Sequence, residues 1–457
     1  MVSGGGSTIS PANCSALRLS VKTTSPSMKV DLMLTRPIRC LSAMFLIVGS
    51  CAPCLGQGSD LPGVGELPYR KAMPDPLVMQ SGKKVASPDE WPARRDELKQ
   101  LFEHYMYGKA PPAPEKIQFE VTREEKDYFD GQATLREVTI HYGPAGAPPI
   151  HLLFIAPNSE DKSPVVLGLN FCGNHTLLDD PKIALPKVWM PNRCPGCEGN
   201  KATDKGRGTR LDRFDFAYAI ERGYAVATFY HGDIDPDVND FDNGVHPFYR
   251  ERGEKQGPHD WACIAAWAWG LSRAIDYLEQ DDKIDDERII VYGHSRNGKT
   301  ALLCGAFDER AAIVIPHQAG CGGSSPSRSE VGEQLRDINS RFPHWFCRQF
   351  HQFNEKVGHL PIDQNCLIAL CAPRPVLLTN AIKDQWADPT GQFAALRSAY
   401  SVYQFLDAPG LEAEKQPPLG QPVLSHLGYY IREGGHSVTR DDWKVFLDFA
   451  DRRFGRD

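Results

Sequence analysis

Ser295 combines a nucleophilic side chain with a local sequence that could place it on a sharp turn. It lies in Gly293-His-Ser-Arg-Asn-Gly298, directly after the apolar run 289–292 and directly before a helical run. Small residues allow the close packing of a strand-turn-helix elbow, which exposes the serine hydroxyl at the edge of a sheet. The helix start also offers backbone N–H groups to a developing oxyanion. Gly298 comes one residue later than in the strict Gly-x-Ser-x-Gly pattern, but the flanking elements favour Ser295 as a nucleophile.

A base and an acid for this serine follow it along the chain. Triads built on such elbows run in the order serine, acid, histidine. His436 lies in a Gly-Gly-His loop just before the last amphipathic helix, where a base must lie, and His426 is the alternative base. Asp384 follows an apolar run and could accept the Nδ1–H of the histidine, whereas Asp388 is interpreted as a solvated turn aspartate before proline. The order predicts a triad of Ser295, His436 and Asp384.

Buried strands alternating with amphipathic helices would hold these residues. Two hairpin strands are followed by apolar runs typical of buried strands; together these segments are 133–142, 150–156, 165–171, 224–230, 289–292, 312–316 and 375–381. The stretch 262–278 is apolar at intervals of three and four residues, which is typical of a helix packed on a sheet. The pattern predicts the α/β-hydrolase fold, with a mainly parallel central sheet and helices on both faces in a three-layer sandwich.

One catalytic domain is expected, preceded by a leader and a wrapping segment. The leader covers residues 1–56, a Pro-rich N-terminal wrap covers 57–130, and the catalytic domain covers 131–457. Two long segments without a periodic pattern, 173–213 and 235–260, are predicted to be loop insertions. Loops of this length inside a compact domain are usually functional.

The leader has the charge and hydropathy pattern of an export signal. Basic residues precede the apolar run 41–55, which is too short to span a bilayer comfortably and is typical of a secretory signal. Val48-Gly-Ser-Cys51 also resembles a bacterial lipobox, in which Cys51 would carry a lipid anchor; the alternative is a signal cut near Gly56. Both alternatives predict a secreted, periplasmic or cell-surface protein without an integral membrane span.

Composition and cysteine content narrow the class of protein further. The 457 residues carry a net charge of −7 and are 41% hydrophobic, which provides a sizeable core and argues against a dedicated nucleic-acid binder. Nine of the thirteen cysteines follow the leader, and an odd number in an oxidising compartment leaves at least one free thiol. Cys194-Pro-Gly-Cys197 lacks the second ligand pair that zinc requires, so a loop disulfide is predicted there. We expect a monomer.

Four motifs together resemble those of a known family. Gly-His-Ser295-Arg-Asn-Gly-Lys299, Arg-Phe-Pro-His-Trp345-Phe, Asp384-Gln-Trp-Ala-Asp-Pro and the Gly-Gly-His436 loop are similar to motifs of glucuronoyl esterases, specifically the bacterial branch of carbohydrate esterase family fifteen. The resemblance implies an α/β-hydrolase fold and no metal or other cofactor. It also implies hydrolysis of esters of glucuronic or 4-O-methylglucuronic acid, which link lignin alcohols to glucuronoxylan in plant cell walls.

The resemblance also implies roles for residues around the triad. Arg296 would place a permanent cation near the tetrahedral oxyanion, where a fixed charge needs no reorganisation. Lys299 lies one helical turn after Ser295 and would hydrogen-bond sugar hydroxyls. Trp386 would line the sugar site, and Glu333 would accept hydrogen bonds from the hydroxyls of the uronate. Asn170-Phe-Cys-Gly-Asn-His follows an early central strand and is expected to supply further oxyanion N–H groups.

One position departs from the fungal members of the family. Their triad glutamate corresponds to Gln318 here, and an amide cannot balance the charge of an imidazolium. Either the acid has moved to Asp384, as the resemblance to bacterial members implies, or catalysis is impaired. The fungal disulfide between nucleophile and base segments is absent, since His294 and Ser437 occupy those positions.

Two alternative functions remain open at the level of sequence. The same scaffold could carry an acetylxylan esterase or another carbohydrate esterase, because a fold alone does not fix the substrate. A catalytically silent polysaccharide-binding relative is the other alternative, and Gln318 is its support. Arg296 and Lys299 favour an anionic or hydroxyl-rich acyl group over acetate.

Overall fold

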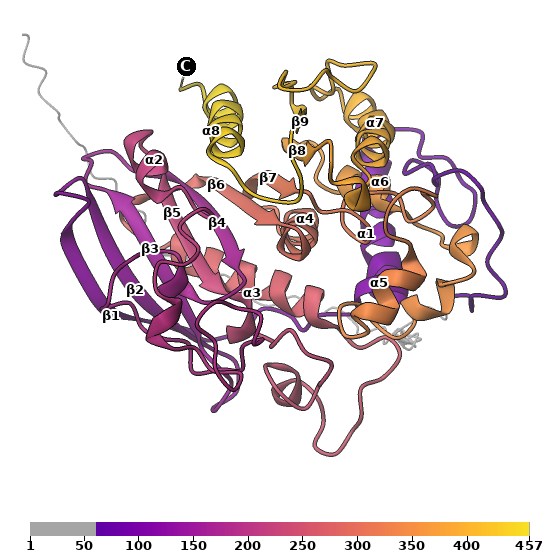
Figure 1. Cartoon of the computed structure of the whole chain (residues 1–457). Helices are drawn as coiled ribbons and strands as arrows, with labels where there is room; N and C mark the ends of the chain where they lie inside the picture. The colour runs from indigo at the N-terminus through magenta and orange to yellow at the C-terminus, as the bar shows by residue number, and fades with distance from the viewer. Residues whose placement is uncertain (1–60, 457) are drawn as a thin grey trace, which may run out of the picture. The chain divides into compact units, whose positions relative to one another are not determined.

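A nine-stranded sheet runs through the computed structural model, which describes residues 61–456 (Figure 1). The spatial order is β1-β2-β3-β5-β4-β6-β7-β8-β9. The strands are β1 (Ile117–Tyr128), β2 (Ala133–Tyr142), β3 (Ile150–Pro157), β4 (Ser163–Asn170), β5 (Ala225–Tyr230), β6 (Ile284–His294), β7 (Ala311–His317), β8 (Val376–Ala381) and β9 (Leu427–Arg432). The first three strands pair antiparallel and the remaining six pair parallel, so the mainly parallel sheet is confirmed.

Four of the parallel strands are buried because both of their faces are covered. Every residue of β4, β5, β8 and β9 is buried, and β4, β5 and β8 are therefore mostly apolar without alternation, whereas β9 ends in Arg432. β1 differs: its residues alternate between exposed and half-buried, and it lies at the edge of the sheet. Because the sequence of β1 is mostly polar, its pattern of apolar residues did not predict a strand there. The pattern also did not predict β9.

Helices cover both faces of the sheet and form the outer layers. They are α1 (Trp91–Phe102), α2 (Phe216–Glu221), α3 (Cys263–Leu278), α4 (Arg296–Phe307), α5 (Leu335–Arg341), α6 (Gln364–Ala369), α7 (Pro389–Phe405) and α8 (Arg440–Phe454). Residues of α1, α3, α4, α6 and α7 share one core with Val165 and Leu167, whereas residues of α2 and α8 share a second core with Val166. Because alternate residues of β4 enter opposite cores, the predicted three-layer sandwich is confirmed.

The expected domain boundary at residue 130 falls inside a hairpin. β1 pairs with β2 from Ile117 opposite Tyr142 to Tyr128 opposite Ala133, so the end of the expected wrap belongs to the same sheet as the catalytic strands. The chain from residue 60 onward forms one compact unit. The leader, 1–56, and Cys51 within it lie outside the described residues. No helix in the described part of the chain is long and apolar enough to cross a membrane.

The parallel strands bring their carboxyl ends to one edge of the sheet. β4 ends at Asn170, β8 at Ala381 and β9 at Arg432, and each is followed by a loop at that edge, whereas Ser295 alone separates the end of β6 from α4. The two predicted insertions, 173–213 and 235–260, contain only short turns of 3-10 helix and isolated bridges. The edge is therefore where the predicted catalytic residues and the irregular segments meet.

Candidate active site

Ser295 occupies a strained turn between β6 and α4. Its φ of 60° and ψ of −125° are unusual for a residue with a side chain. A Cβ on Gly293 would lie 1.9 Å from the carbonyl oxygen of Asn297, so the tight turn requires glycine there. The backbone N–H of Ser295 donates to the carbonyl of His317 at the end of β7 (2.9 Å). The elbow has the geometry that its sequence predicted, and its strain is typical of a functional position.

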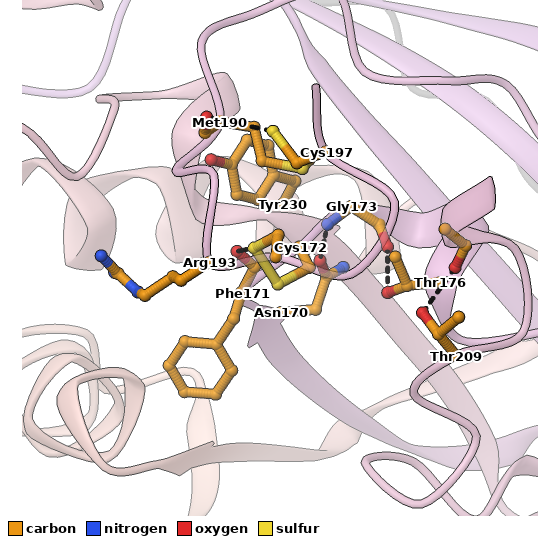
Figure 2. The surroundings of a disulfide bond; sticks show 12 residues. Asn170, Phe171, Cys172, Gly173, Thr176, Met190, Arg193, Cys197, Thr209 and Tyr230 are labelled. Carbon is orange, nitrogen blue, oxygen red and sulfur yellow. Dashed lines mark hydrogen bonds between the residues drawn. A yellow bond between two sulfur atoms is a disulfide. The ribbon is translucent and has the colours of Figure 1, made fainter. Parts of the chain in front are cut away.

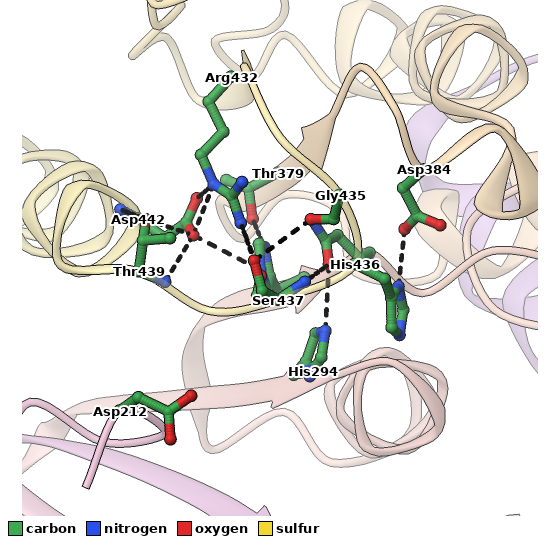
Figure 3. A network of polar contacts seen from close by, with 12 residues as sticks. Asp212, His294, Thr379, Asp384, Arg432, Gly435, His436, Ser437, Thr439 and Asp442 are labelled. Atoms are coloured by element: carbon green, nitrogen blue, oxygen red, sulfur yellow. Dashed lines mark hydrogen bonds and ion pairs between the residues drawn. The ribbon is translucent and has the colours of Figure 1, made fainter. Parts of the chain in front are cut away.

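His436 and Asp384 meet at the same edge of the sheet (Figure 3). Nδ1 of His436 lies 2.7 Å from Oδ2 of Asp384, whose side chain is 6% exposed. A hydrogen bond from Nδ1–H to this carboxylate would favour the tautomer in which Nε2 carries no proton. Ser295 and His436 both line a cavity of about 250 Å³. The structure thus brings together the serine, histidine and aspartate that the sequence singled out.

The two alternatives from the sequence lie outside this group. His426 precedes β9, at the opposite end of the strand from His436, and its Nε2 lies 2.6 Å from the carbonyl of Pro373. Asp388 was expected to be a solvated turn residue, and that expectation is wrong: its side chain is buried. It caps α7 by accepting from the N–H of Gly391 (2.8 Å) and also accepts from the hydroxyl of Ser325 (2.9 Å). Burial follows because the carboxylate satisfies donors from two segments.

Gln318 holds the loop that carries His436. Its Oε1 accepts from the backbone N–H of Ser437 (3.0 Å), and its Nε2 donates to the carbonyl of Gly435 (3.4 Å). The same Oε1 lies 3.0 Å from Nε2 of His294, whose ring packs 4.5 Å from the ring of His436, centroid to centroid. The amide of Gln318 therefore contacts both chain neighbours of His436, whereas Nδ1 of His436 pairs with Asp384.

Arg296 is held in a buried polar cluster around Asp237. Its guanidinium pairs with this carboxylate and lies 4.5 Å from the ring centroid of Trp345. Asp237 also accepts from Nε1 of Trp345 (2.8 Å) and Nη2 of Arg193 (2.7 Å), and Nε2 of His344 lies 3.0 Å away. Burial alone would raise the pKa of Asp237, but the contact with His344 and the charge of Arg296 hold it well below its usual range.

Asp237 was missed by sequence reasoning. Its only signal was its place in the 235–260 segment, which was identified as an insertion without an assigned residue. Arg296, Arg193 and Trp345 come from three other segments, and no spacing rule connects them to Asp237. The contact network that makes this aspartate important exists only in the folded chain.

Lys299, Glu333 and Trp386 lie near one another but outside the cavity that contains Ser295. Nζ of Lys299 donates to the carbonyls of Ala319 (2.6 Å) and Cys321 (2.5 Å). Burial lowers the pKa of Lys299, and the charge of Glu333 opposes this. The backbone N–H of Glu333 donates to the carbonyl of Trp386 (2.9 Å), and the Trp386 side chain is 49% exposed. None of the three lines the 250 Å³ cavity.

The loop after β4 takes its shape from the side chain of Asn170. Its Oδ1 accepts from the N–H of Gly173 (2.8 Å), and its Nδ2 donates to Oδ1 of Asn174 (2.7 Å). Asn170 and Phe171 both line the cavity next to Ser295. The loop expected to supply additional oxyanion donors thus lies beside the elbow.

The predicted disulfide within Cys194-Pro-Gly-Cys197 is wrong. Cys194 is bonded to Cys172, with their Cα atoms 5.5 Å apart, and Cys197 is a free thiol (Figure 2). The Sγ of Cys197 faces the carbonyl of Met190 (3.4 Å). The insertion folds back onto the residues that follow β4, which brings in a partner that spacing could not identify. The bond ties the 173–213 insertion to the edge of the sheet.

One group of described residues could contribute several ligand atoms to a metal ion. The side chains of Asp235, His246 and Cys263 are buried, and their potential ligand atoms lie within 4.8 Å of one another. Nε2 of His246 lies 3.1 Å from Oδ2 of Asp235, so a hydrogen bond accounts for the contact of these two. None of the three lines the cavity with Ser295. This buried group is therefore separate from the cavity that Ser295 and His436 line.

Comparisons with known sequences show similarity to esterases. Residues 211–407 match the family described as "Glucuronyl esterase, fungi". Carbohydrate esterase MZ0003, from an unknown prokaryotic organism, is 47% identical over 386 residues, which cover 83% of this chain and 89% of that protein. A 4-O-methyl-glucuronoyl methylesterase of Phanerochaete carnosa is 26% identical over 347 residues, covering 74% and 73% of the two chains.

Comparisons with solved structures extend the likeness to the fold. A promiscuous CE15 esterase from the marine bacterial metagenome has a TM-score of 0.79 and 46% identity, covering 85% of this chain and 98% of that one. A glucuronoyl esterase from Solibacter usitatus has a TM-score of 0.79 and 36% identity, covering 86% of this chain and 100% of that one. The similarity to these esterases, in both sequence and fold, therefore covers most of the chain.

Proposed function

Because the chain belongs to carbohydrate esterase family 15, we propose that it is a serine-type carboxylic ester hydrolase that cleaves glucuronoyl and 4-O-methylglucuronoyl esters of lignin-carbohydrate complexes. The observation that carries the proposal is the contact between His436 and Asp384 beside a strained serine elbow. The glucuronoyl substrate is supported by the relatives that carry this activity in their names.

The proposed reaction begins with attack of Ser295 Oγ on the ester carbonyl. Nε2 of His436 takes the hydroxyl proton, and Asp384 stabilises the imidazolium that forms. The tetrahedral intermediate collapses as its bond to the alcohol oxygen breaks, and His436 returns the proton to that oxygen. Water then attacks the acyl-enzyme with His436 again as the base, which releases glucuronate and restores Ser295.

Arg296 is proposed to stabilise the oxyanion together with backbone N–H groups. Arg296 lines the cavity at the start of α4, and the pairing of its guanidinium with Asp237 and its packing on Trp345 hold the side chain in one position. A charge that is already oriented contributes more to the transition state than one that must reorganise. Asp237 is thus proposed to act through Arg296 as a positioning residue.

Lys299, Glu333 and Trp386 are proposed to bind the uronate ring. Two backbone carbonyls hold the ammonium of Lys299, which leaves a third N–H for a sugar hydroxyl. The exposed indole of Trp386 offers a face on which a sugar ring can stack, and the backbone contact of Glu333 with Trp386 places a carboxylate nearby.

The rival activities are separated by direct comparison of substrates. Benzyl glucuronate and acetylated xylan should be assayed with the wild-type enzyme and with Ser295→Ala. We expect a higher kcat/KM for the glucuronate ester and loss of turnover in Ser295→Ala. Faster release of acetate would favour an acetylxylan esterase, and oligosaccharide binding without any turnover would favour a polysaccharide-binding protein.

Export of the protein as a monomer is also proposed. The disulfide between Cys172 and Cys194 supports an oxidising compartment, since such bonds are rare in the cytosol. A lipid anchor on Cys51 would retain the enzyme at the membrane surface. Fractionation of producing cells should place the wild-type protein outside the cytosol, and Cys51→Ala should release it from membranes if the anchor exists.

A further inference from the structure

We propose that the cavity beside Ser295 binds the alcohol portion of the ester, and that Arg210 and Arg213 make the enzyme prefer aromatic alcohols that carry an anionic group. The proposal rests on the proposed esterase function and specifies its substrate. The cavity would bind the alcohol, which is the first product to leave. Lys299, Glu333 and Trp386 are proposed to bind the acyl group.

The position of the cavity indicates that it holds the alcohol portion of the ester. Ser295 and His436 line it, whereas the three proposed uronate contacts do not. An ester carbonyl held at Ser295 has its acyl group on one side and its alcohol on the other. If the uronate occupies the side of Lys299 and Trp386, the alcohol extends into the cavity. His436, which must protonate the departing alcohol oxygen, lies in the wall of that cavity.

The apolar part of the lining suits an aromatic ring. The cavity measures about 250 Å³, and a cavity of roughly 150 Å³ can already hold benzene. Apolar and aromatic residues line much of it, among them Phe171, Phe214 and Tyr292, and the disulfide cysteines 172 and 194 line it as well. The disulfide fixes the segments that carry Phe171 and Arg193 against each other (Figure 2). The two segments are therefore linked covalently on this side of the cavity.

The charged part of the lining has one sign. Four arginines line the cavity, namely Arg193, Arg210, Arg213 and Arg296, and no aspartate or glutamate does. Arg193 and Arg296 share the carboxylate of Asp237. A site with a cationic lining and an apolar wall selects ligands that combine a ring with an acidic group.

Arg210 is the cation that remains available. Among the described residues its guanidinium has no hydrogen bond and no ion pair, although the residue is half-buried. Nε of Arg213 lies 3.4 Å from Oδ2 of Asp212, which is 55% exposed, so this pair is loosely held. The backbone fixes both residues: Arg210 N donates to the Thr176 carbonyl (2.8 Å), and Arg213 N donates to the Arg210 carbonyl (3.1 Å).

Arg207, on the same loop, shows what a structural arginine does here. Its Nη1 donates to the carbonyls of Asp180 (3.1 Å) and Ile183 (2.8 Å), and its Nε donates to Asp204 (2.7 Å). Arg210 makes no comparable contact and lines the cavity instead. The contrast indicates that Arg210 is positioned for a ligand and not for the fold.

Two glucuronate esters of matched size test the proposal. In one, the ester alcohol is 4-(hydroxymethyl)benzoate, which carries a carboxylate; in the other, it is the neutral 4-(hydroxymethyl)benzamide. We expect the wild-type enzyme to show a kcat/KM about tenfold higher for the carboxylate ester, because a partly buried guanidinium favours an anion. The preference should decrease as the KCl concentration rises.

Variants of the cavity arginines separate recognition from stability. Arg210→Gln should reduce the preference about three- to tenfold, Arg210→Lys should retain part of it, and Arg213→Gln should reduce it less, because Asp212 shares that charge. Arg252→Gln, on an exposed loop outside the cavity, should leave the preference unchanged. Thermal midpoints of all variants should equal that of the wild type, which would show that the effect does not arise from unfolding.

The outcomes distinguish this proposal from the esterase function. Equal kcat/KM for the two esters in the wild type, or an unaltered preference in Arg210→Gln, would overturn the inference and leave the esterase function standing. If methyl glucuronate and both benzyl esters were all left intact, the esterase function would fail, and this inference would fail with it.

Discussion

Oε1 of Gln318 accepts a hydrogen bond from the backbone N–H of Ser437 at 3.0 Å, one residue after His436. In fungal relatives the resemblance implies a catalytic glutamate at this position, whereas here the amide holds the loop that carries His436, the proposed base. The donor on the same amide contacts Gly435, on the other side of His436. Position 318 therefore remains linked to the histidine, but through the backbone of its loop and not through charge.

Substitution of Gln318 should disturb the position of His436. Gln318→Ala removes both loop contacts, and we expect kcat to fall about tenfold with a smaller change in KM, because positioning affects the reaction step more than binding. Gln318→Glu keeps the acceptor but loses the donor to Gly435, so it should also lower kcat. Kinetics on benzyl glucuronate measure both effects. Wild-type kcat in both variants would show that the loop does not need the clamp.

Asp384→Asn should reduce kcat by about 10²–10⁴, by analogy with replacement of a triad aspartate. The amide cannot stabilise the imidazolium, and it can donate to Nδ1 and favour the wrong tautomer. Combining Asp384→Asn with Gln318→Glu should not restore activity, because the side chain of residue 318 faces His294 and Ser437. Asp441→Asn, at an exposed position on α8, is the control. Near-wild-type activity of Asp384→Asn would remove Asp384 from the triad.

Asp237→Asn should impair both stability and catalysis. The substitution leaves the buried guanidinium of Arg296 without its counter-charge, and breaking a buried ion pair in this way costs about 3 kcal/mol or more of unfolding free energy. Arg296, the proposed oxyanion donor, would also lose its fixed orientation, so kcat should fall. Urea denaturation and steady-state kinetics measure the two effects. Unaltered values of both would contradict the role assigned to Asp237.

The disulfide should contribute to stability, and the remaining cysteine of the CxxC motif should not. Cys172 and Cys194 are 22 residues apart in sequence, and opening a loop of about this length lowers the unfolding free energy by about 3 kcal/mol. Cys172→Ser should therefore lower the urea midpoint under oxidising conditions. Cys197→Ser is the matched control and should change it little. Equal midpoints for the two variants would argue against the bond.

Acid should destabilise the fold through buried histidines. Burial lowers the pKa of His231 and of His175 to about 4, whereas in the unfolded chain each has its ordinary pKa of about 6.5. The unfolded chain therefore binds more protons between these pH values. The free energy of unfolding should fall as the pH drops from about 6.5 towards 4, by up to about 1.4 kcal/mol per pH unit for each histidine.

Urea denaturation at pH 7, 6 and 5 measures this dependence. His231→Gln cannot take up the proton and should show a shallower decline of stability with falling pH, whatever its stability at pH 7. A decline identical to that of the wild type would mean that His231 does not contribute to the acid sensitivity.

Local patterns in the amino-acid sequence predicted most of the buried strands and the chain order of the proposed triad. Continuous apolar runs predicted the buried parallel strands because both faces of such strands must be apolar, and the glycines around Ser295 predicted the elbow because only small residues fit there. The order of serine, aspartate and histidine along the chain selected His436 over His426. These features are local, or depend only on chain order, so the residues alone carry them.

Contacts between residues far apart in the sequence became apparent only in the folded chain. β1 was missed because an exposed edge strand needs no apolar face, and Cys172 was missed as a disulfide partner because loop folding, not spacing, brings it to Cys194. Asp237 accepts hydrogen bonds from three separate segments. Gln318 contacts the residues on both sides of His436. No local sequence pattern predicts either set of contacts. A hydrogen bond requires two atoms to lie within about 3 Å of each other in space. The number of residues between them in the sequence does not reveal that distance.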